Sequence, residues 1–186
     1  MPVHVSPIAD PKEANMSVES KFLTRRPRRQ GLAERAGEQI SRTAGAIARG
    51  LIAGAAGTAA MTISSTLEAK LRGRGESSAP ADAAGEVLGV EPTDEQRRRR
   101  FATLVHWCYG TSWGAARGLI DKTGLDGPAA TATHGALVWG SAAAMLPSLG
   151  VAPPIWRWGV KEITIDLFHH GVYAAAAGAA YEAISP

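Results

Sequence analysis

Four long apolar segments follow a polar start along this chain. They cover residues 46–69, 101–120, 128–149 and 163–184. Each approaches the ~20 residues that an α-helix needs to cross the hydrocarbon core of a bilayer. The turn-forming sequences "TGLDGP" and "PSLGVAPPIW" separate the last three segments. The pattern predicts an all-α protein, a transmembrane bundle of four helices.

The polar flanks of these segments predict further elements. Residues 1–45 read as a basic N-terminal tail that ends in an interfacial amphipathic helix, and residues 46–186 as the four-span domain. Between the first two spans, residues 80–88 predict a short surface helix. A capping box at Thr93, with Gln96 three residues later, predicts the start of the second long helix before its apolar part.

Glycines inside the apolar segments are spaced for close helix packing. Three lie four residues apart in the second segment, and three share one side of the first. In water such glycines only destabilise a helix, whereas in lipid they allow the backbones to approach each other. We therefore expect helix packing at Gly50, Gly54, Gly57, Gly110, Gly114 and Gly118.

Charge is distributed unevenly, although the mean hydropathy of −0.06 resembles that of a soluble protein. Residues 102–116 and 129–156 contain no Lys, Arg, Asp or Glu. The net charge is +3, and basic runs such as "RRPRR", "KLRGR" and "RRRR" flank apolar segments, which favours lipid headgroups over nucleic acid as their partner. A soluble, alanine-rich four-helix bundle remains the alternative architecture.

Polar residues inside the apolar segments fall on single helix faces, which we call the polar seam. At 100° per residue, one stripe forms on each of three helices. Ionisable groups in a span avoid lipid and pair with one another, so these faces should turn inward. His134 is expected to stand apart, nearer the opposite surface. The seam comprises Ser64 and Glu68 on the first helix, His106, Tyr109, Trp113 and Arg117 on the second, and Glu162, Asp166, His169, His170 and Tyr173 on the fourth.

Three hypotheses account for the seam. Its members could form hydrogen bonds that fix the register of the helices. They could bind a metal or haem, because imidazole and carboxylate are the ligand types that Zn, Fe and Mn sites use. They could relay protons, because histidine titrates near neutrality. The metal candidates are Glu68, His106, Asp166, His169 and His170, whereas the single Cys108 excludes a cysteine-based zinc site.

Three stretches resemble a known family at these residues. "GLIAGAAGTAAM", "LVHWCYGTSWGAARGLI" and "GVAPPIWRWGVKEITIDLFHHGVYAAAAGAAYEAI" are similar to the YagU-like proteins, an uncharacterised family of small bacterial inner-membrane proteins with four helices. The resemblance covers residues 49–184. It implies four spans, cytoplasmic termini and a link to acid stress, and it supplies no cofactor or catalytic residue.

The sequence favours a non-enzymatic role, because Walker, dinucleotide, nucleophile-elbow and His-Glu-x-x-His signatures are missing from it. We expect a multi-pass protein of the bacterial inner membrane, an accessory subunit or scaffold of a membrane complex or a stress-related protein. Its expected partners are the bilayer and other membrane subunits or further copies of itself, and the tail is expected to bind a partner or anionic lipid. No cofactor is expected. The alternative is a small metal- or haem-binding or proton-conducting membrane protein.

Overall fold

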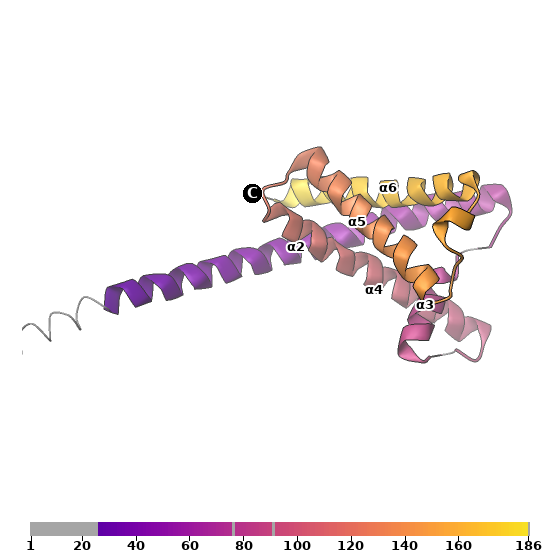
Figure 1. Cartoon of the computed structure of the whole chain (residues 1–186), viewed down its shortest axis with the longest axis horizontal. Helices are drawn as coiled ribbons and strands as arrows, with labels where there is room; N and C mark the ends of the chain where they lie inside the picture. Colours follow the sequence, from indigo (N-terminus) through magenta and orange to yellow (C-terminus); the bar gives the residue numbers. More distant parts are fainter. Residues whose placement is uncertain (1–25, 76, 91, 186) are drawn as a thin grey trace, which may run out of the picture. The chain divides into compact units, whose positions relative to one another are not determined.

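The computed structural model describes residues 26–75, 77–90 and 92–185, with side chains from residue 31 onward. This part of the chain is helical and contains no strand (Figure 1). The elements are α2 (Arg26–Arg72), α3 (Ala79–Leu88), α4 (Glu95–Asp121), α5 (Gly127–Ser148), the 3-10 helix η1 (Ile155–Arg157) and α6 (Val160–Ile184). The chain divides into two compact units, Met1–Arg42 and Thr43–Pro186. We call Thr43–Pro186 the packed unit.

Local sequence signals explain where most helices begin and end. Asp94 caps α4 by accepting a hydrogen bond from the Arg97 backbone N–H at 2.8 Å. The predicted cap at Thr93 is therefore wrong by one residue, because the carboxylate supplies the oxygen that reaches the free N–H groups of the first turn. The surface helix predicted at 80–88 is confirmed as α3, which ends at Gly89 in a left-handed conformation with φ 64°.

The first long helix contains both the predicted interfacial helix and the predicted first apolar segment. α2 is one helix from Arg26 to Arg72, and no helix end separates residues 1–45 from 46–69. No proline follows Pro27 within α2, so the backbone hydrogen bonding is not interrupted where the polarity of the sequence changes. The predicted tail at residues 1–25 lies outside the described residues.

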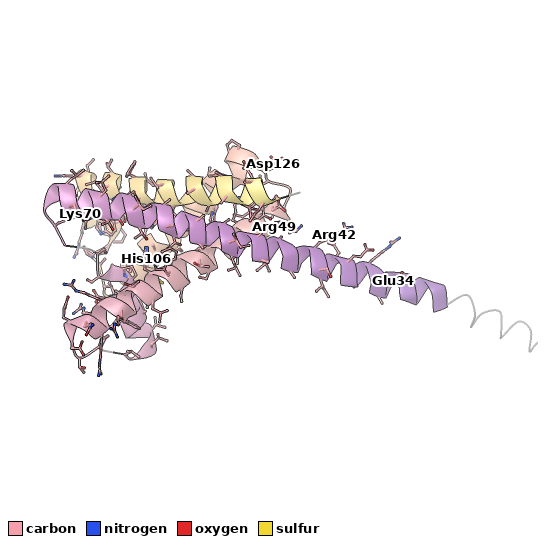
Figure 2. The ribbon with its side chains drawn as sticks, turned by 180° about the vertical axis from the view of Figure 1, so that it is seen from behind. Glu34, Arg42, Arg49, Lys70, His106 and Asp126 are labelled. Atoms are coloured by element: carbon pink, nitrogen blue, oxygen red, sulfur yellow. The ribbon has the colours of Figure 1, made fainter. Side chains whose placement is uncertain are left out.

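Helix α2 runs antiparallel to both α4 and α6. Gly50 lies against Gly114 and Thr58 against Gly110, so residue numbers rise on α2 as they fall on α4. Ser64 reaches His169 and Gly57 lies against Tyr173, which gives the same relation between α2 and α6. Figures 1 and 2 show α6 alongside the later part of α2, with α4 crossing them.

Glycines set the distance between α2 and α4. A Cβ atom added to Gly114 would overlap the carbonyl oxygen of Gly50, and one added to Gly118 would overlap that of Ala46. A Cβ on Gly54 would lie 2.6 Å from the Thr111 carbonyl oxygen. The six glycines singled out from the sequence all have another helix within contact distance of an added Cβ. They permit the close backbone approach that their spacing predicted.

The interior of the packed unit is made of small and polar residues. Its fully buried side chains include Thr58, Arg117, His134, Tyr173 and Tyr181. Large apolar side chains instead lie outside on several helices, among them Ile52, Ile63, Leu104, Leu137 and Phe168. Most soluble proteins have the opposite arrangement.

Fewer helices have the length and hydropathy of a membrane span than the four predicted. Within the described residues, a single helical segment, Gly31–Arg72, is by length and composition able to cross a membrane. The helices predicted at 101–120, 128–149 and 163–184 exist as α4, α5 and α6, but by length and composition they are not candidate spans. Glycine and histidine in all three helices, and charged residues in α4 and α6, lower their mean hydropathy.

Candidate functional site

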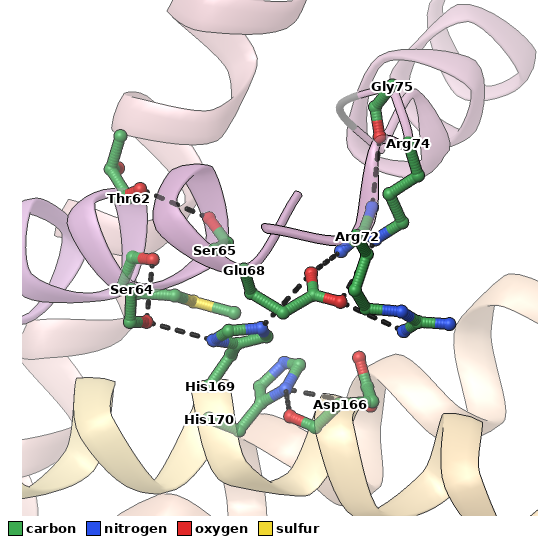
Figure 3. Close-up of polar contacts among 11 residues, drawn as sticks. Thr62, Ser64, Ser65, Glu68, Arg72, Arg74, Gly75, Asp166, His169 and His170 are labelled. Atoms are coloured by element: carbon green, nitrogen blue, oxygen red, sulfur yellow. Dashed lines mark hydrogen bonds and ion pairs between the residues drawn. The ribbon is translucent and has the colours of Figure 1, made fainter. Parts of the chain in front are cut away.

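His169 lies at the centre of the polar seam, where α6 faces α2. Its side chain is 6% exposed, and its Nδ1 lies 2.9 Å from the Ser64 hydroxyl (Figure 3). The same hydroxyl donates to the Met61 carbonyl oxygen at 3.0 Å, so it accepts a hydrogen from His169 Nδ1. In the neutral ring, Nε2 then carries the lone pair. The inward orientation predicted for His169 is confirmed.

Glu68 approaches this histidine but is held by two arginines. Its Oε2 is 3.7 Å from His169 Nε2, which is too long for a hydrogen bond. Arg72 donates to Oε1 at 2.9 Å, and the Arg74 guanidinium contacts both carboxylate oxygens. The carboxylate is therefore already neutralised at the end of α2. Protonation of His169 Nε2 would aim a third cation at it.

Asp166 connects α6 to α5 instead of to α2. The indole Nε1 of Trp139 donates to its Oδ2 at 2.8 Å. His170 folds back over the preceding turn, where its Nδ1 lies 2.8 Å from the Asp166 carbonyl oxygen and 3.6 Å from its carboxylate. His170 is half-buried, as expected for the edge of the seam. This acid and imidazole thus form a pair beside the His169 contacts.

His106 forms a separate contact between α4 and α2. Its Nε2 lies 2.9 Å from the Thr62 hydroxyl, which donates its own hydrogen to the Thr58 carbonyl oxygen at 2.7 Å. The Thr62 oxygen therefore accepts from the imidazole. This bond joins the two helices that the glycines bring together.

The five metal candidates do not converge on one point. In the described part of the chain, no group of three or more His, Cys, Asp or Glu side chains could hold a metal ion. Glu68 faces arginines, His106 faces a threonine, and Asp166 faces a tryptophan. The arrangement suits hydrogen bonding between helices better than coordination.

The remaining members of the seam have different surroundings. Tyr173 is buried and donates to the Gly110 carbonyl oxygen at 2.6 Å, while Tyr109 meets Trp113 edge-on with ring centres 6.2 Å apart. Glu162 is exposed, so its assignment to the seam is wrong. It lies in the first turn of α6, where an acidic side chain is stabilised by the helix dipole without a buried partner.

His134 does not stand apart, contrary to the expectation. It is fully buried, and its Nε2 donates to the Trp113 carbonyl oxygen at 3.0 Å. Its ring also lies 5.6 Å from that of Tyr173, centre to centre. Its position early in α5 predicted that it lies nearer the opposite membrane surface, away from the seam. Its side chain nevertheless contacts seam residues of both α4 and α6.

Arg117 belongs to a second group of polar residues, which we call the arginine cluster. Its guanidinium lies over the Tyr181 ring at 4.4 Å, and Arg49 lies 6.0 Å from the same ring centre. Glu182 is 3.8 Å from Arg117 Nη2. The cluster comprises Arg49, Arg117, Tyr181 and Glu182.

Sequence analysis missed several of these residues. Trp139 and Thr62 form hydrogen bonds with seam residues, but the sequence analysis searched mainly for ionisable side chains and these two have none. Tyr181 had a detectable signal, because Tyr173, Ala177 and Tyr181 follow each other at intervals of four residues on one helix face.

Comparisons with protein-family models, with curated proteins and with solved structures find no match to this chain.

Proposed function

We propose that this protein is a multi-pass membrane protein without enzymatic activity, an accessory subunit or scaffold whose polar seam fixes the register of a four-helix bundle. In this proposal α4, α5, α6 and the apolar part of α2 cross the bilayer. The observation that carries it is the inverted distribution of side chains. Large apolar residues face outward while histidine, arginine and tyrosine are buried.

The exposed apolar side chains occur on every one of these helices. Leu51 and Ile63 are exposed on α2, Leu104 and Leu119 on α4, and Leu167 on α6. In water such a surface would favour association or aggregation. In lipid it is the expected exterior, and the packing energy then comes from close helix contact and interhelical hydrogen bonds.

The interior supports a structural role for the seam. Ser64–His169, Thr62–His106 and Trp139–Asp166 are direct contacts between different helices. Each joins a different pair of helices, namely α2 with α6, α2 with α4, and α5 with α6. Such bonds specify which helices are neighbours and at which register, because a one-turn slip would leave buried polar groups without partners. A scaffold needs this specificity, and no reacting group is required for it.

Fractionation of native membranes tests the proposal. We expect the protein to remain in the membrane pellet after washes with sodium carbonate or high salt, and to be released only by detergent. A peripheral membrane protein would leave the pellet in carbonate. Recovery as a monomer that is soluble without detergent would overturn the proposal.

The alternative, proton conduction, is favoured by one observation. His169 Nε2 is buried without a hydrogen-bond partner and lies 3.7 Å from Glu68. A proton arriving there would create an ion pair. Proton flux into liposomes that contain the purified protein, lost in His169→Gln, would support this function. Stoichiometric metal or haem in the same preparation would support the cofactor-binding form of the alternative.

A further inference from the structure

We infer that the arginine cluster is a binding site for a phosphate oxyanion. This inference goes beyond the proposed function and does not depend on it. Seven buried side-chain nitrogen and oxygen atoms in the described part of the chain have no hydrogen-bond partner. Four of these belong to the cluster: Arg49 Nε, Arg117 Nε, Arg117 Nη1 and Tyr181 Oη.

Arg117 is the strongest part of the argument. Its side chain is 1% exposed, yet two of its nitrogens donate to nothing. A buried charged group without acceptors is costly, so buried arginines are normally paired and hydrogen-bonded. The Tyr181 ring stabilises the positive charge but accepts no conventional hydrogen bond from these nitrogens. The negative ends of the α4 and α6 dipoles stabilise a cation here, but no carbonyl oxygen accepts a hydrogen bond from these two nitrogens.

Glu182 does not complete the site. Its carboxylate is 3.8 Å from Arg117 Nη2, beyond hydrogen-bond length, and its side chain is 52% exposed. Two arginines and one glutamate leave a local charge of about +1. One singly charged phosphodiester would neutralise this charge.

The unpartnered donors fit a phosphate group better than a single carboxylate. N–H groups of two arginines and the Tyr181 hydroxyl offer hydrogens from α2, α4 and the C-terminal part of α6. Phosphate oxygens accept bonds from several directions, and arginine binds them with parallel N–H groups. Arg49 is half-buried and Glu182 half-exposed, so the cluster reaches the surface beside them. Figure 2 shows Arg49 and Asp126 at one end of the packed unit and Lys70 at the other.

Two ligands carry such a phosphate group: an anionic lipid, in its headgroup, and free inorganic phosphate. The test uses the full-length protein purified in a neutral detergent. Three probes are titrated at constant ionic strength: dioctanoyl phosphatidylglycerol, sodium phosphate, and dioctanoylglycerol, which has the same chains but no phosphate. Binding is read from the rise in Tm and from calorimetry. A response to phosphatidylglycerol alone identifies the lipid as the source, and a response to inorganic phosphate identifies the free anion.

Variants make the test specific. Arg49→Gln should weaken binding at least about tenfold, because it removes a charge-assisted hydrogen bond. Glu182→Gln should strengthen binding, because it removes the competing negative charge. This gain cannot arise from a loss of folding. Lys122→Gln is the matched control, a nearby cation paired with Asp121 at 3.7 Å and outside the cluster, and it should bind as the native protein does.

Three results would overturn the inference. One is no response to either phosphate-containing probe. Another is an equal response to dioctanoylglycerol, which would assign the effect to the acyl chains. The third is a variant pattern that contradicts the cluster: an equal loss of binding in Lys122→Gln and Arg49→Gln would show that the effect is not specific to it, and a loss of binding in Glu182→Gln would show that Glu182 is the partner of the arginines. None of these outcomes bears on carbonate extraction, so failure here leaves the membrane proposal untouched.

Discussion

His169 illustrates how a polar side chain can be predicted from helix geometry alone. Counting 100° per residue placed it on the face of Asp166 and Tyr173, and the structure buries it against Ser64. The same counting failed for Glu162, which is exposed, and the position of His134 along its helix did not predict its contacts with Trp113 and Tyr173. The spacing of residues in the sequence gives the angular position of a side chain around its helix. Which residue of a neighbouring helix it contacts depends on how the two helices cross, and the sequence of one helix does not determine this.

The Ser64 contact gives a prediction at this scale. Ser64→Ala should lower the free energy of unfolding by about 1–2 kcal/mol, because the buried Nδ1 of His169 loses its partner. Ser65→Ala is the control, since that hydroxyl bonds only to the Thr62 carbonyl oxygen within its own helix at 3.2 Å. Both variants are compared with the native protein by denaturation in the same detergent. Equal losses would show that the Ser64–His169 bond adds no stability.

At the scale of elements, the helices of the packed unit were the most predictable feature. α4, α5 and α6 lie within a few residues of their predicted positions after the charged flank of α4 is included, because proline, glycine and capping residues interrupt the chain between them. The interfacial helix predicted within residues 1–45 and the span predicted at 46–69 are parts of one continuous helix, α2. Glycine spacing predicted which faces pack closely, but it did not predict which helices pair or the interhelical partners of Trp139 and Arg117, which depend on tertiary geometry.

The contact between α2 and α4 gives the second prediction. Gly114→Leu should destabilise the packed unit by about 1–3 kcal/mol, because even its Cβ would overlap the Gly50 backbone. Ala115→Leu, one residue round the helix at a half-buried position, should cost less. Thermal unfolding in detergent measures both. If the two substitutions had the same effect, the glycine row would not be a close interface.

At the scale of the whole molecule, the single cysteine offers a test of what surrounds the protein. Cys108 is exposed on α4 among apolar residues, so in the membrane proposal its thiol faces lipid. In sealed vesicles of either orientation, a charged maleimide should leave Cys108 unlabelled until the protein is unfolded in dodecyl sulfate. A second protein carrying Ser77→Cys and Cys108→Ser should be labelled without unfolding in one orientation. Labelling of Cys108 in both intact preparations would contradict the proposal.

The basic N-terminal residues lead to the last prediction. Residues 25–29, "RRPRR", concentrate positive charge in a segment outside the packed unit Thr43–Pro186. Deleting residues 1–30 removes none of the contacts described for the packed unit, so its thermal unfolding in detergent should be unchanged. Binding to vesicles with anionic lipid should weaken, and the difference from the full-length protein should shrink as salt is raised, because screening reduces the attraction of exposed charges. Binding that is unaffected by the deletion at low salt would mean that the tail makes no electrostatic contact with lipid. A lower unfolding temperature would mean instead that these residues help to stabilise the packed unit.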